Sequence, residues 1–252
     1  MLEVARLVKE FGGLRAVDDV SFTLREGTIT GLIGPNGAGK TTLFDTIAGV
    51  HRPDGGEIVF RGRRIGGRPP HRIFGEGLVR TFQIPRPFAG MTVLENCMLV
   101  PQAQAGERFW NNWVARGRVR AQERAIRERA LETLEFVGLA RLRGEFARNL
   151  SGGQQKLLEL ARVLMAEPRL ILLDEPGAGV NPTLLTAIVE RLRELHARGI
   201  TFLVIEHNMD LVMNLCDPIL VMAQGKLLMQ GSPEAVRSDA RVLEAYLGGA
   251  PA

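Results

Sequence analysis

One stretch of the sequence combines glycines, a lysine and a threonine at a spacing that binds phosphate. Residues 34–41 read Gly-Pro-Asn-Gly-Ala-Gly-Lys-Thr, which fits the pattern G-x-x-x-x-G-K-[ST]. The glycines allow consecutive backbone N–H groups to point at phosphate oxygens, at the positive end of the helix expected to follow. Lys40 would reach the β- and γ-phosphates of a nucleotide, and the Thr41 hydroxyl would coordinate Mg²⁺. The motif therefore predicts a nucleoside triphosphate site.

Two carboxylates follow an apolar run later in the chain. The residues Leu-Ile-Leu-Leu at 170–173 lead directly into Asp174 and Glu175. A carboxylate at the carboxyl end of a central strand lies beside the phosphate loop, so Asp174 is suited to hold Mg²⁺ or its waters. Glu175 is suited to polarise an attacking water molecule. Alone, such a pattern is more often the start of a loop, and the phosphate motif is what favours the catalytic interpretation. The guanine-selecting pattern N-K-x-D is absent, which favours adenine.

Strands and helices must hold these motifs in place. The β-branched run 28–34 predicts a buried strand before the phosphate motif, and a helix is expected from Lys40 to about Val50. The continuous apolar runs 170–173 and 202–205 are typical of parallel strands covered on both faces. Residues 61–72 are rich in Gly, Pro and Arg, which predicts a loop or the edge of a hairpin.

Two patterns in the C-terminal half predict the N-terminus of a helix. Asn181-Pro182 predicts an N-cap followed by proline in the first turn. Ser232-Pro233-Glu234 repeats this signal and predicts a C-terminal helix that reaches about Leu247. Strands and helices thus alternate on both sides of a helical insertion, which indicates an α/β core with an inserted helical subdomain.

The insertion, from about residue 91 to 166, follows a helical pattern. Its longest apolar face is formed by residues spaced by 7, 4, 4 and 3 positions: Val119, Ile126, Ala130, Leu134 and Val137. Gly138 is expected to end this helix, and a second helix is expected from Gln154 to Met165. The predicted domains are therefore 1–90 with 166–230 as the core, 91–165 as the helical subdomain, and 231–252 as a C-terminal helix and tail.

Composition narrows the class of protein. The chain has 252 residues, of which 45% are hydrophobic and 24% charged, and this is ordinary globular composition. Its two cysteines, Cys97 and Cys216, cannot build a disulfide framework. The first residues show no export signal, and no apolar run approaches the length of a membrane-spanning helix. We expect a cytoplasmic protein that is able to dock on a membrane protein. Only Lys9, Lys40, Lys156 and Lys226 are lysines.

The segment Leu150-Ser151-Gly152-Gly153-Gln154-Gln155-Lys156 adds a third motif. By itself it is a Ser-Gly-Gly turn at a helix N-terminus, either an anion site or only a helix cap. Together with the two motifs above, in the same order, the chain resembles the ATP-binding-cassette (ABC) ATPases over essentially its whole length. The resemblance implies a P-loop ATPase core with a mixed, largely parallel sheet, flanking helices and N-terminal antiparallel strands.

The resemblance also implies roles for single residues. Phe11 matches the aromatic residue that stacks on adenine, although alone it would be an ordinary Phe. Gln83 matches the glutamine that senses Mg²⁺ and the γ-phosphate, and His207 matches the switch histidine that contacts the γ-phosphate. Ser151, Gly152 and Gly153 would contact ATP bound by the partner subunit of a head-to-tail dimer. The family usually has an aspartate where this chain has the uncharged Asn181.

Taken together, the expected site consists of ATP, Mg²⁺ and three groups of residues. The catalytic residues would be Glu175, His207, Gln83 and Lys40. The metal ligands would be Thr41, Gln83 and Asp174. The nucleotide-binding residues would be Phe11, Asn36, Gly37, Ala38, Gly39, Lys40, Thr41, Thr42, Ser151, Gly152 and Gly153.

Details favour one group of importers. The stretches 11–18, 80–83, 150–161, 177–182, 205–210 and 244–248 are similar to the ATPases that import branched-chain amino acids. Residues 100–118, with Trp110 and Trp113, fit the longer insert of one of them, unless these tryptophans simply pack the insert. Urea-type importers and lipopolysaccharide-export ATPases share much of the pattern. The implied partners are a second ATPase subunit, identical or related, two membrane permeases and a solute-binding protein, at the cytoplasmic face of the membrane.

Two other classes compete with a transport ATPase. The net charge of +4 and the arginine-rich loop 61–72 are compatible with a nucleic-acid-associated ATPase, although no nucleic-acid partner is expected. A regulatory module without turnover would have to lack a catalytic group, whereas Lys40, Asp174, Glu175 and His207 are all in place.

Overall fold

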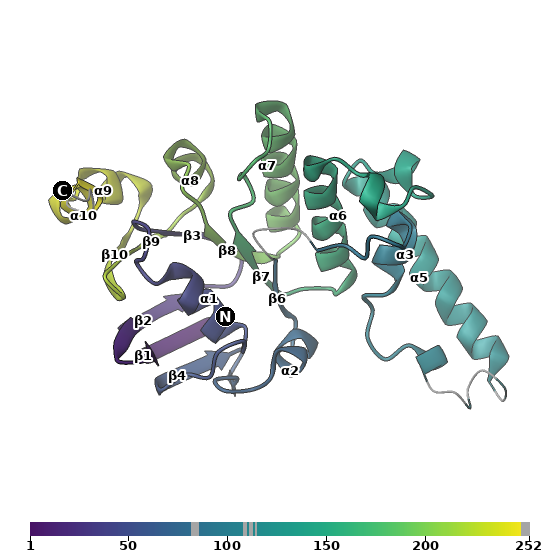
Figure 1. The fold of residues 1–252 in the computed structure, drawn as a ribbon, viewed down its shortest axis with the longest axis horizontal. Coiled ribbons are helices and arrows are strands. Elements are labelled where there is room, and N and C mark those ends of the chain that lie inside the picture. Colours follow the sequence, from purple (N-terminus) through teal and green to yellow (C-terminus); the bar gives the residue numbers. More distant parts are fainter. Residues whose placement is uncertain (82–85, 108–109, 111–112, 114, 248–252) are drawn as a thin grey trace. The chain divides into compact units, whose positions relative to one another are not determined.

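The computed structural model describes residues 1–81, 86–107, 110, 113 and 115–247 (Figure 1). The chain forms two compact units. We call residues 1–80, 169–177 and 192–252 the core unit, and residues 81–168 and 178–191 the helical unit. Each unit is described by itself.

Two β-sheets form the framework of the core unit. An antiparallel sheet has the strand order β2-β1-β4-β5, with the bounds Leu14–Leu24, Leu2–Phe11, Gly55–Phe60 and Arg63–Arg64. A second sheet has the order β10-β9-β3-β8-β7-β6, with the bounds Lys226–Gly231, Ile219–Ala223, Ile29–Ile33, Thr201–Ile205, Leu170–Asp174 and Leu78–Arg80. All strands of the second sheet run parallel except β10, which pairs antiparallel with β9.

The central strands form where the sequence is continuously apolar. Every residue of β3, β7 and β8 is buried, as expected for parallel strands covered on both faces. In their register, Leu32 and Asp174 both pair with Ile205, so the three strands end at the same edge of the sheet. The residues that follow these strands are therefore brought together.

Helices complete each unit. Those of the core unit are α1 (Lys40–Ile47), α2 (Pro70–Gly75), α8 (Met209–Leu215), α9 (Pro233–Ser238) and α10 (Ala240–Leu247). The helical unit contains α3 (Val93–Met98), α5 (Arg116–Phe136), α6 (Gly152–Met165) and the short 3₁₀ turns Ala105–Glu107, Ala140–Leu142 and Ala147–Asn149. Helix α7 (Pro182–Ala197) contributes residues to both units.

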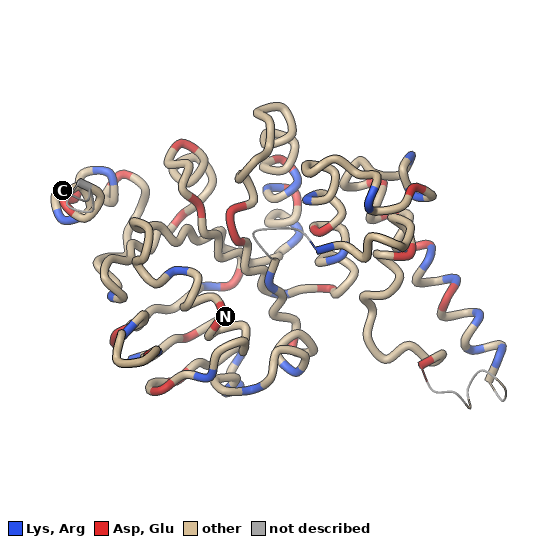
Figure 2. Tube along the Cα trace, in the orientation of Figure 1, with Lys and Arg blue, Asp and Glu red and all other residues tan. Residues whose placement is uncertain are grey.

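The predicted apolar face of α5 is buried. Its members Val119, Ile126, Ala130 and Leu134, together with Val137 just beyond the helix, are at most 8% exposed. Charged residues of both signs are spread along this helix (Figure 2), and Gly138 comes directly after its last turn with a φ of 79°. The pattern of the sequence therefore located this helix correctly.

The predicted fold class, an α/β core with a largely parallel sheet, N-terminal antiparallel strands and added helices, is confirmed. The predicted functional domain boundaries stay a prediction. No helix among the residues described is both long and apolar enough to cross a membrane.

Two local predictions were wrong. The C-terminal helix is two helices, because Asp239 is extended and its carboxylate accepts a hydrogen bond from the Arg241 N–H (2.8 Å), which starts a new helix. Helix α1 ends at Ile47 and not at Val50, since Gly49 leaves the helix with a φ of 79°. Trp110 and Trp113, for which packing of the insert was one of two interpretations, are 76% and 67% exposed, and the guanidinium of Arg116 lies 5.8 Å from the ring centroid of Trp113.

The buried sheet predicts a contrast between two leucines. Leu203 in β8 is fully buried, whereas Leu14 in β2 is 70% exposed. We expect Leu203→Ala to lower the free energy of unfolding by about 2–5 kcal/mol, because it leaves a cavity in the core. Leu14→Ala is the matched control and should change it by less than about 0.5 kcal/mol. Urea-induced unfolding measures both, and equal effects would contradict the packing described here.

Candidate functional site

The phosphate motif connects the end of β3 to the start of α1. Gly34 and Gly39 have φ values of 152° and 95°. A Cβ atom on Gly34 would lie 2.1 Å from the carbonyl oxygen of Met222, and one on Gly39 would lie 2.1 Å from that of Ala16. Only glycine fits at these two positions, which explains the spacing of the motif in terms of backbone contacts.

Lys40 is enclosed by this loop. The residue is 6% exposed, and its Nζ donates hydrogen bonds to the carbonyl oxygens of Gly34 (2.8 Å) and Pro35 (2.9 Å). Burial lowers the pKa of the Lys40 ammonium group, and the charges of Glu175 and Asp174 partly oppose this shift. The loop therefore holds a partly desolvated cation that anionic phosphates would stabilise.

The N-terminus of α1 is open to an anion. Its N-cap, Gly39, has no side chain, and no acidic residue lies in the first turn. Asn36, Gly37 and Thr41 are exposed, Thr42 is half-buried, and Ala38 is buried. Unpaired N–H groups and the helix dipole together favour a phosphate at this end.

Asp174, at the end of β7, is held by a cation from the neighbouring strand. Arg80 of β6 contacts both Asp174 (3.1 Å) and Asp45 of α1. Asp174 is 6% exposed, and burial raises the pKa of its carboxyl group, while Arg80 acts in the opposite direction. Arg80 thus links α1, β6 and β7 around this carboxylate.

Glu175 and His207 lie close together, as expected from the strand order. Oε1 of Glu175 is 2.9 Å from Nε2 of His207. Glu175 has a φ of 48°, an uncommon left-handed conformation, and its N–H donates to the carbonyl oxygen of Ile205 (2.9 Å). Such local strain is typical of functional positions.

Glu206 organises the turns around this pair. Its side chain is 4% exposed and accepts hydrogen bonds from the N–H groups of Gly177 (2.6 Å), His207 (3.0 Å) and Asn208 (3.3 Å). One buried carboxylate therefore ties the loop after Glu175 to the loop after β8.

Phe11 ends β1 and is 44% exposed. Its ring makes an edge contact with His51, with the ring centroids 5.1 Å apart, and the ammonium of Lys9 lies 5.1 Å from the ring centroid. An exposed aromatic ring held from two sides can stack on a planar base.

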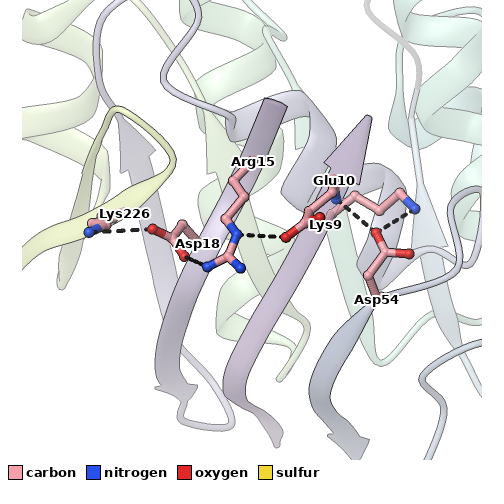
Figure 3. A network of polar contacts seen from close by, with 6 residues as sticks. All are labelled: Lys9, Glu10, Arg15, Asp18, Asp54 and Lys226. Carbon is pink, nitrogen blue, oxygen red and sulfur yellow. Dashed lines mark hydrogen bonds and ion pairs between the residues drawn. The ribbon is translucent and has the colours of Figure 1, made fainter. Parts of the chain in front are cut away.

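A network of charged side chains connects neighbouring strands of the core unit (Figure 3). Arg15 contacts Glu10 (2.6 Å) and Asp18 (3.2 Å), and Asp18 also contacts Lys226 (3.3 Å). Asp54 accepts from Lys9 (2.8 Å) and from the N–H of Glu10 (2.7 Å), and these bonds lower the pKa of Asp54. Single surface pairs of this kind contribute little stability.

The third motif lies in the helical unit. Ser151 is the N-cap of α6: its hydroxyl accepts from the Gln154 N–H (3.3 Å), and the Gln154 side chain accepts from the Ser151 N–H (2.9 Å). Among the described residues, nothing lies within 4 Å of a Cβ built on Gly152, whereas one on Gly153 would meet the Leu184 side chain. Asn181 caps α7 by accepting from the Leu184 N–H (2.9 Å), as predicted. Gln83 lies outside the described residues.

Sequence reasoning assigned no role to Arg80, Glu206 or His51. Arg80 precedes the predicted Gln83, and Glu206 precedes His207. A charged residue at the end of an otherwise apolar strand is a signal for both, because a buried charge needs a partner. His51 gives no such signal, since only the fold brings it to Phe11.

Comparison with known proteins gives the family. A family model described as "ABC transporter" matches residues 17–178, which include the phosphate motif, the third motif and Glu175. The chain belongs to the ABC transporter family. It is an ABC ATPase, as the motifs predicted. A second model, described as "Branched-chain amino acid ATP-binding cassette transporter", matches residues 226–252.

Individual relatives of this ABC ATPase match along almost its whole length. The probable branched-chain amino acid transport ATP-binding protein LivG of Archaeoglobus fulgidus is 44% identical, covering 98% of this chain and 95% of the relative. The high-affinity branched-chain amino acid transport ATP-binding protein BraF of Pseudomonas aeruginosa is 42% identical, covering 98% of both chains.

Solved structures of ATP-binding cassettes have the same fold. A nucleotide-free ATP-binding cassette from an ABC transporter superposes with a TM-score of 0.84 at 40% identity, covering 98% of both chains. The ADP conformation of another ATP-binding cassette gives a TM-score of 0.82 at 38% identity, again covering 98% of both chains. The fold of the ABC ATPase described above is thus shared with both structures.

The residues present fit a Mg²⁺ ion that arrives with nucleotide. Within the described part of the chain, no group of three or more His, Cys, Asp and Glu side chains is placed to hold a metal. Mg²⁺ takes most of its ligands from phosphates and water in such sites and needs only one or two from protein. The hydroxyl of Thr41 and the carboxylate of Asp174 match this donor set.

Arg80 predicts a pH dependence of stability. In the variant Arg80→Met the cation that lowers the pKa of Asp174 is lost. The pKa of Asp174 should therefore rise further, because burial still raises it. A carboxyl group with a raised folded pKa favours folding most while protonated, so its contribution falls as pH rises from about 3.8 through the folded value. We expect the variant to lose about 3 kcal/mol relative to the wild type near pH 7, and less near pH 4.

Urea unfolding across this pH range measures the effect. Adding Asp174→Asn to the variant should remove the extra slope, and the exposed Arg72→Met should show none. Parallel stability curves for Arg80→Met and the wild type would contradict the role of Arg80.

Proposed function

We propose that this ABC ATPase is the ATP-binding and ATP-hydrolysing subunit of an importer for branched-chain or other hydrophobic amino acids. The observation that carries the proposal is the similarity to LivG and BraF proteins, at 40–44% identity over 98% of the chain. The match of residues 226–252 to a model of the same transporter class supports it.

In the proposed reaction, water attacks the γ-phosphate in line. A bond forms between the water oxygen and phosphorus, the bond to the ADP oxygen breaks, and Glu175 takes the proton. The contact of Glu175 with His207 supports a joint role for these two residues. By the resemblance, His207 and Gln83 would both contact the γ-phosphate. Lys40 neutralises charge that develops on the phosphate oxygens. Mg²⁺, when held by Thr41, Gln83 and Asp174, supplies Lewis-acid stabilisation of the same charge.

The proposed active unit is a head-to-tail dimer with an identical or related ATPase subunit. Ser151, Gly152 and Gly153 of one subunit would contact ATP bound to the phosphate loop of the other. Ser151 and Gly152 are both exposed, and no described residue lies within 4 Å of a Cβ built on Gly152. This supports the proposal, because the N–H groups at the start of α6 can then bind an anion.

Closure of this dimer on two ATP molecules would drive two permease subunits that receive cargo from a solute-binding protein. The protein would then act at the cytoplasmic face of the membrane. Affinity purification of the tagged chain from native membranes, followed by mass spectrometry, tests this. We expect two multi-helix permeases and a second ATPase. Recovery without membrane proteins, or with nucleic acid, would overturn the transport assignment and leave the ATP site intact.

The role of Glu175 predicts a separation of binding from hydrolysis. Glu175→Gln should lower the ATPase rate at least about a hundredfold, because the general base is lost. ATP binding should persist, and the variant should accumulate as a closed dimer in size-exclusion chromatography. Glu26→Gln, an exposed exchange of the same type, is the control. Near-normal turnover would remove Glu175 as the base.

The role of Lys40 predicts a loss of ATP binding, whereas the Glu175 variant should keep it. Lys40→Ala should weaken ATP affinity itself, by about tenfold or more, because a charge-assisted contact to phosphate is lost. Lys226→Ala, at an exposed lysine, should leave affinity unchanged. Binding of a fluorescent ATP analogue measures both, and an unchanged affinity for Lys40→Ala would be incompatible with the proposed phosphate site.

A further inference from the structure

A cavity of about 400 Å³ lies in the core unit between β3 and the helices α8, α9 and α10. Its apolar wall consists of Ile33, Met209, Met213, Val236, Val242 and Leu243. Ile33, Val236 and Val242 are buried, while the two methionines are half-buried and adaptable in shape. The size is that of a site for a small molecule, for which about 300–1,000 Å³ is usual.

Two opposite charges also line this cavity. Asp210 lies in the first turn of α8, and Arg237 lies in the last turn of α9. Both are exposed, and within the described ranges no ion pair joins them to each other or to another side chain. The cavity therefore presents one anion and one cation, each available to a ligand, above an apolar wall.

This combination selects a chemical class. A fatty acid would leave Asp210 unpaired, and an alkyl amine would leave Arg237 unpaired. A nucleotide carries several negative charges, and Asp210 would repel them. A zwitterion with an aliphatic side chain satisfies all three features, with its ammonium at Asp210 and its carboxylate at Arg237. We propose that this cavity binds a free L-α-amino acid with an aliphatic side chain.

Tyr246 connects the cavity to the phosphate loop. It lines the cavity from α10 together with Ile33, which directly precedes Gly34, the first residue of the phosphate motif. Burial raises the pKa of Tyr246 to about 12, although the nearby backbone of Gly34 acts in the opposite direction. A bound amino acid would therefore lie beside the start of the phosphate loop.

Tyr246 also offers a selective probe, because it is the only tyrosine in the chain. The full-length protein labelled with 3-fluorotyrosine gives one ¹⁹F resonance. We expect L-leucine to shift this resonance saturably. The same shift should need at least about tenfold more 4-methylpentanoate, which lacks the ammonium, or 3-methylbutylamine, which lacks the carboxylate, since each loses one charge-assisted bond.

Variants that neutralise Asp210 or Arg237 test whether these two charges bind the ligand. Asp210→Asn and Arg237→Gln should each weaken leucine binding about tenfold. Glu234→Gln is the control for the first, since Glu234 is another acid in the first turn of a short helix but does not line the cavity. Arg72→Gln is the control for the second, since α2 and α9 are both six-residue helices with proline at the start and arginine in the last turn. Thermal unfolding confirms that each variant is folded.

A saturable shift with this selectivity, lost in the two variants and kept in the two controls, supports the proposal. No saturable shift with L-leucine at millimolar concentration, an equal response to 4-methylpentanoate, or unchanged binding by both variants would overturn it. These results are independent of the transport assignment, because the cavity chemistry alone defines the ligand. Loss of this site would leave the permeases recovered from membranes unaffected.

Discussion

The buried ammonium of Lys40 is the interaction on which the rest of the site depends. A cation that is 6% exposed needs compensation, and the carbonyl oxygens of Gly34 and Pro35 provide it. The loop reaches these positions only because Gly34 and Gly39 approach other backbone segments too closely for any side chain. Burial in this loop lowers the pKa of Lys40. The negative charge of a bound polyphosphate would raise this pKa again.

The carboxylates around Lys40 are placed by the sheet and then fixed by individual bonds. The register of β7 and β8 brings Asp174 and Glu175 to the edge where the phosphate loop begins. Arg80 then holds Asp174, and Glu206 gathers the N–H groups that shape the neighbouring turns. Glu206 is buried and binds the N–H of Gly177, two residues after the left-handed Glu175, whose own N–H donates to Ile205.

The parts of the site that follow one another in the sequence could be predicted from it. The phosphate motif, the strand before it and the helix after it are contiguous in the sequence. The buried strands β7 and β8 are recognisable in the sequence as continuous apolar runs. Contacts between distant segments could not be predicted in this way. The bond between Arg80 and Asp174, the packing of His51 on Phe11 and the proximity of Tyr246 to Gly34 all require the completed fold.

In the C-terminal region, too, the sequence pattern alone could not predict the structure. Its helical periodicity continues from Ser232 to Leu247, but the carboxylate of Asp239 bonds to the Arg241 N–H and divides it. The division produces two short helices, α9 and α10, that can turn toward α8 and enclose a cavity. A local side-chain bond, which periodicity does not report, thus decides the shape of that region.

The central claim, that Lys40 is the phosphate-binding cation, can be tested through its own pKa. The chain has only four lysines, so selective ¹³Cε and ¹⁵Nζ labelling gives four side-chain signals, and Lys40→Arg assigns the relevant one. A pH titration with and without ATP and Mg²⁺ should show a depressed Lys40 pKa that rises when nucleotide binds. An unmoved Lys40 signal, with a shift at Lys9, Lys156 or Lys226 instead, would contradict the account.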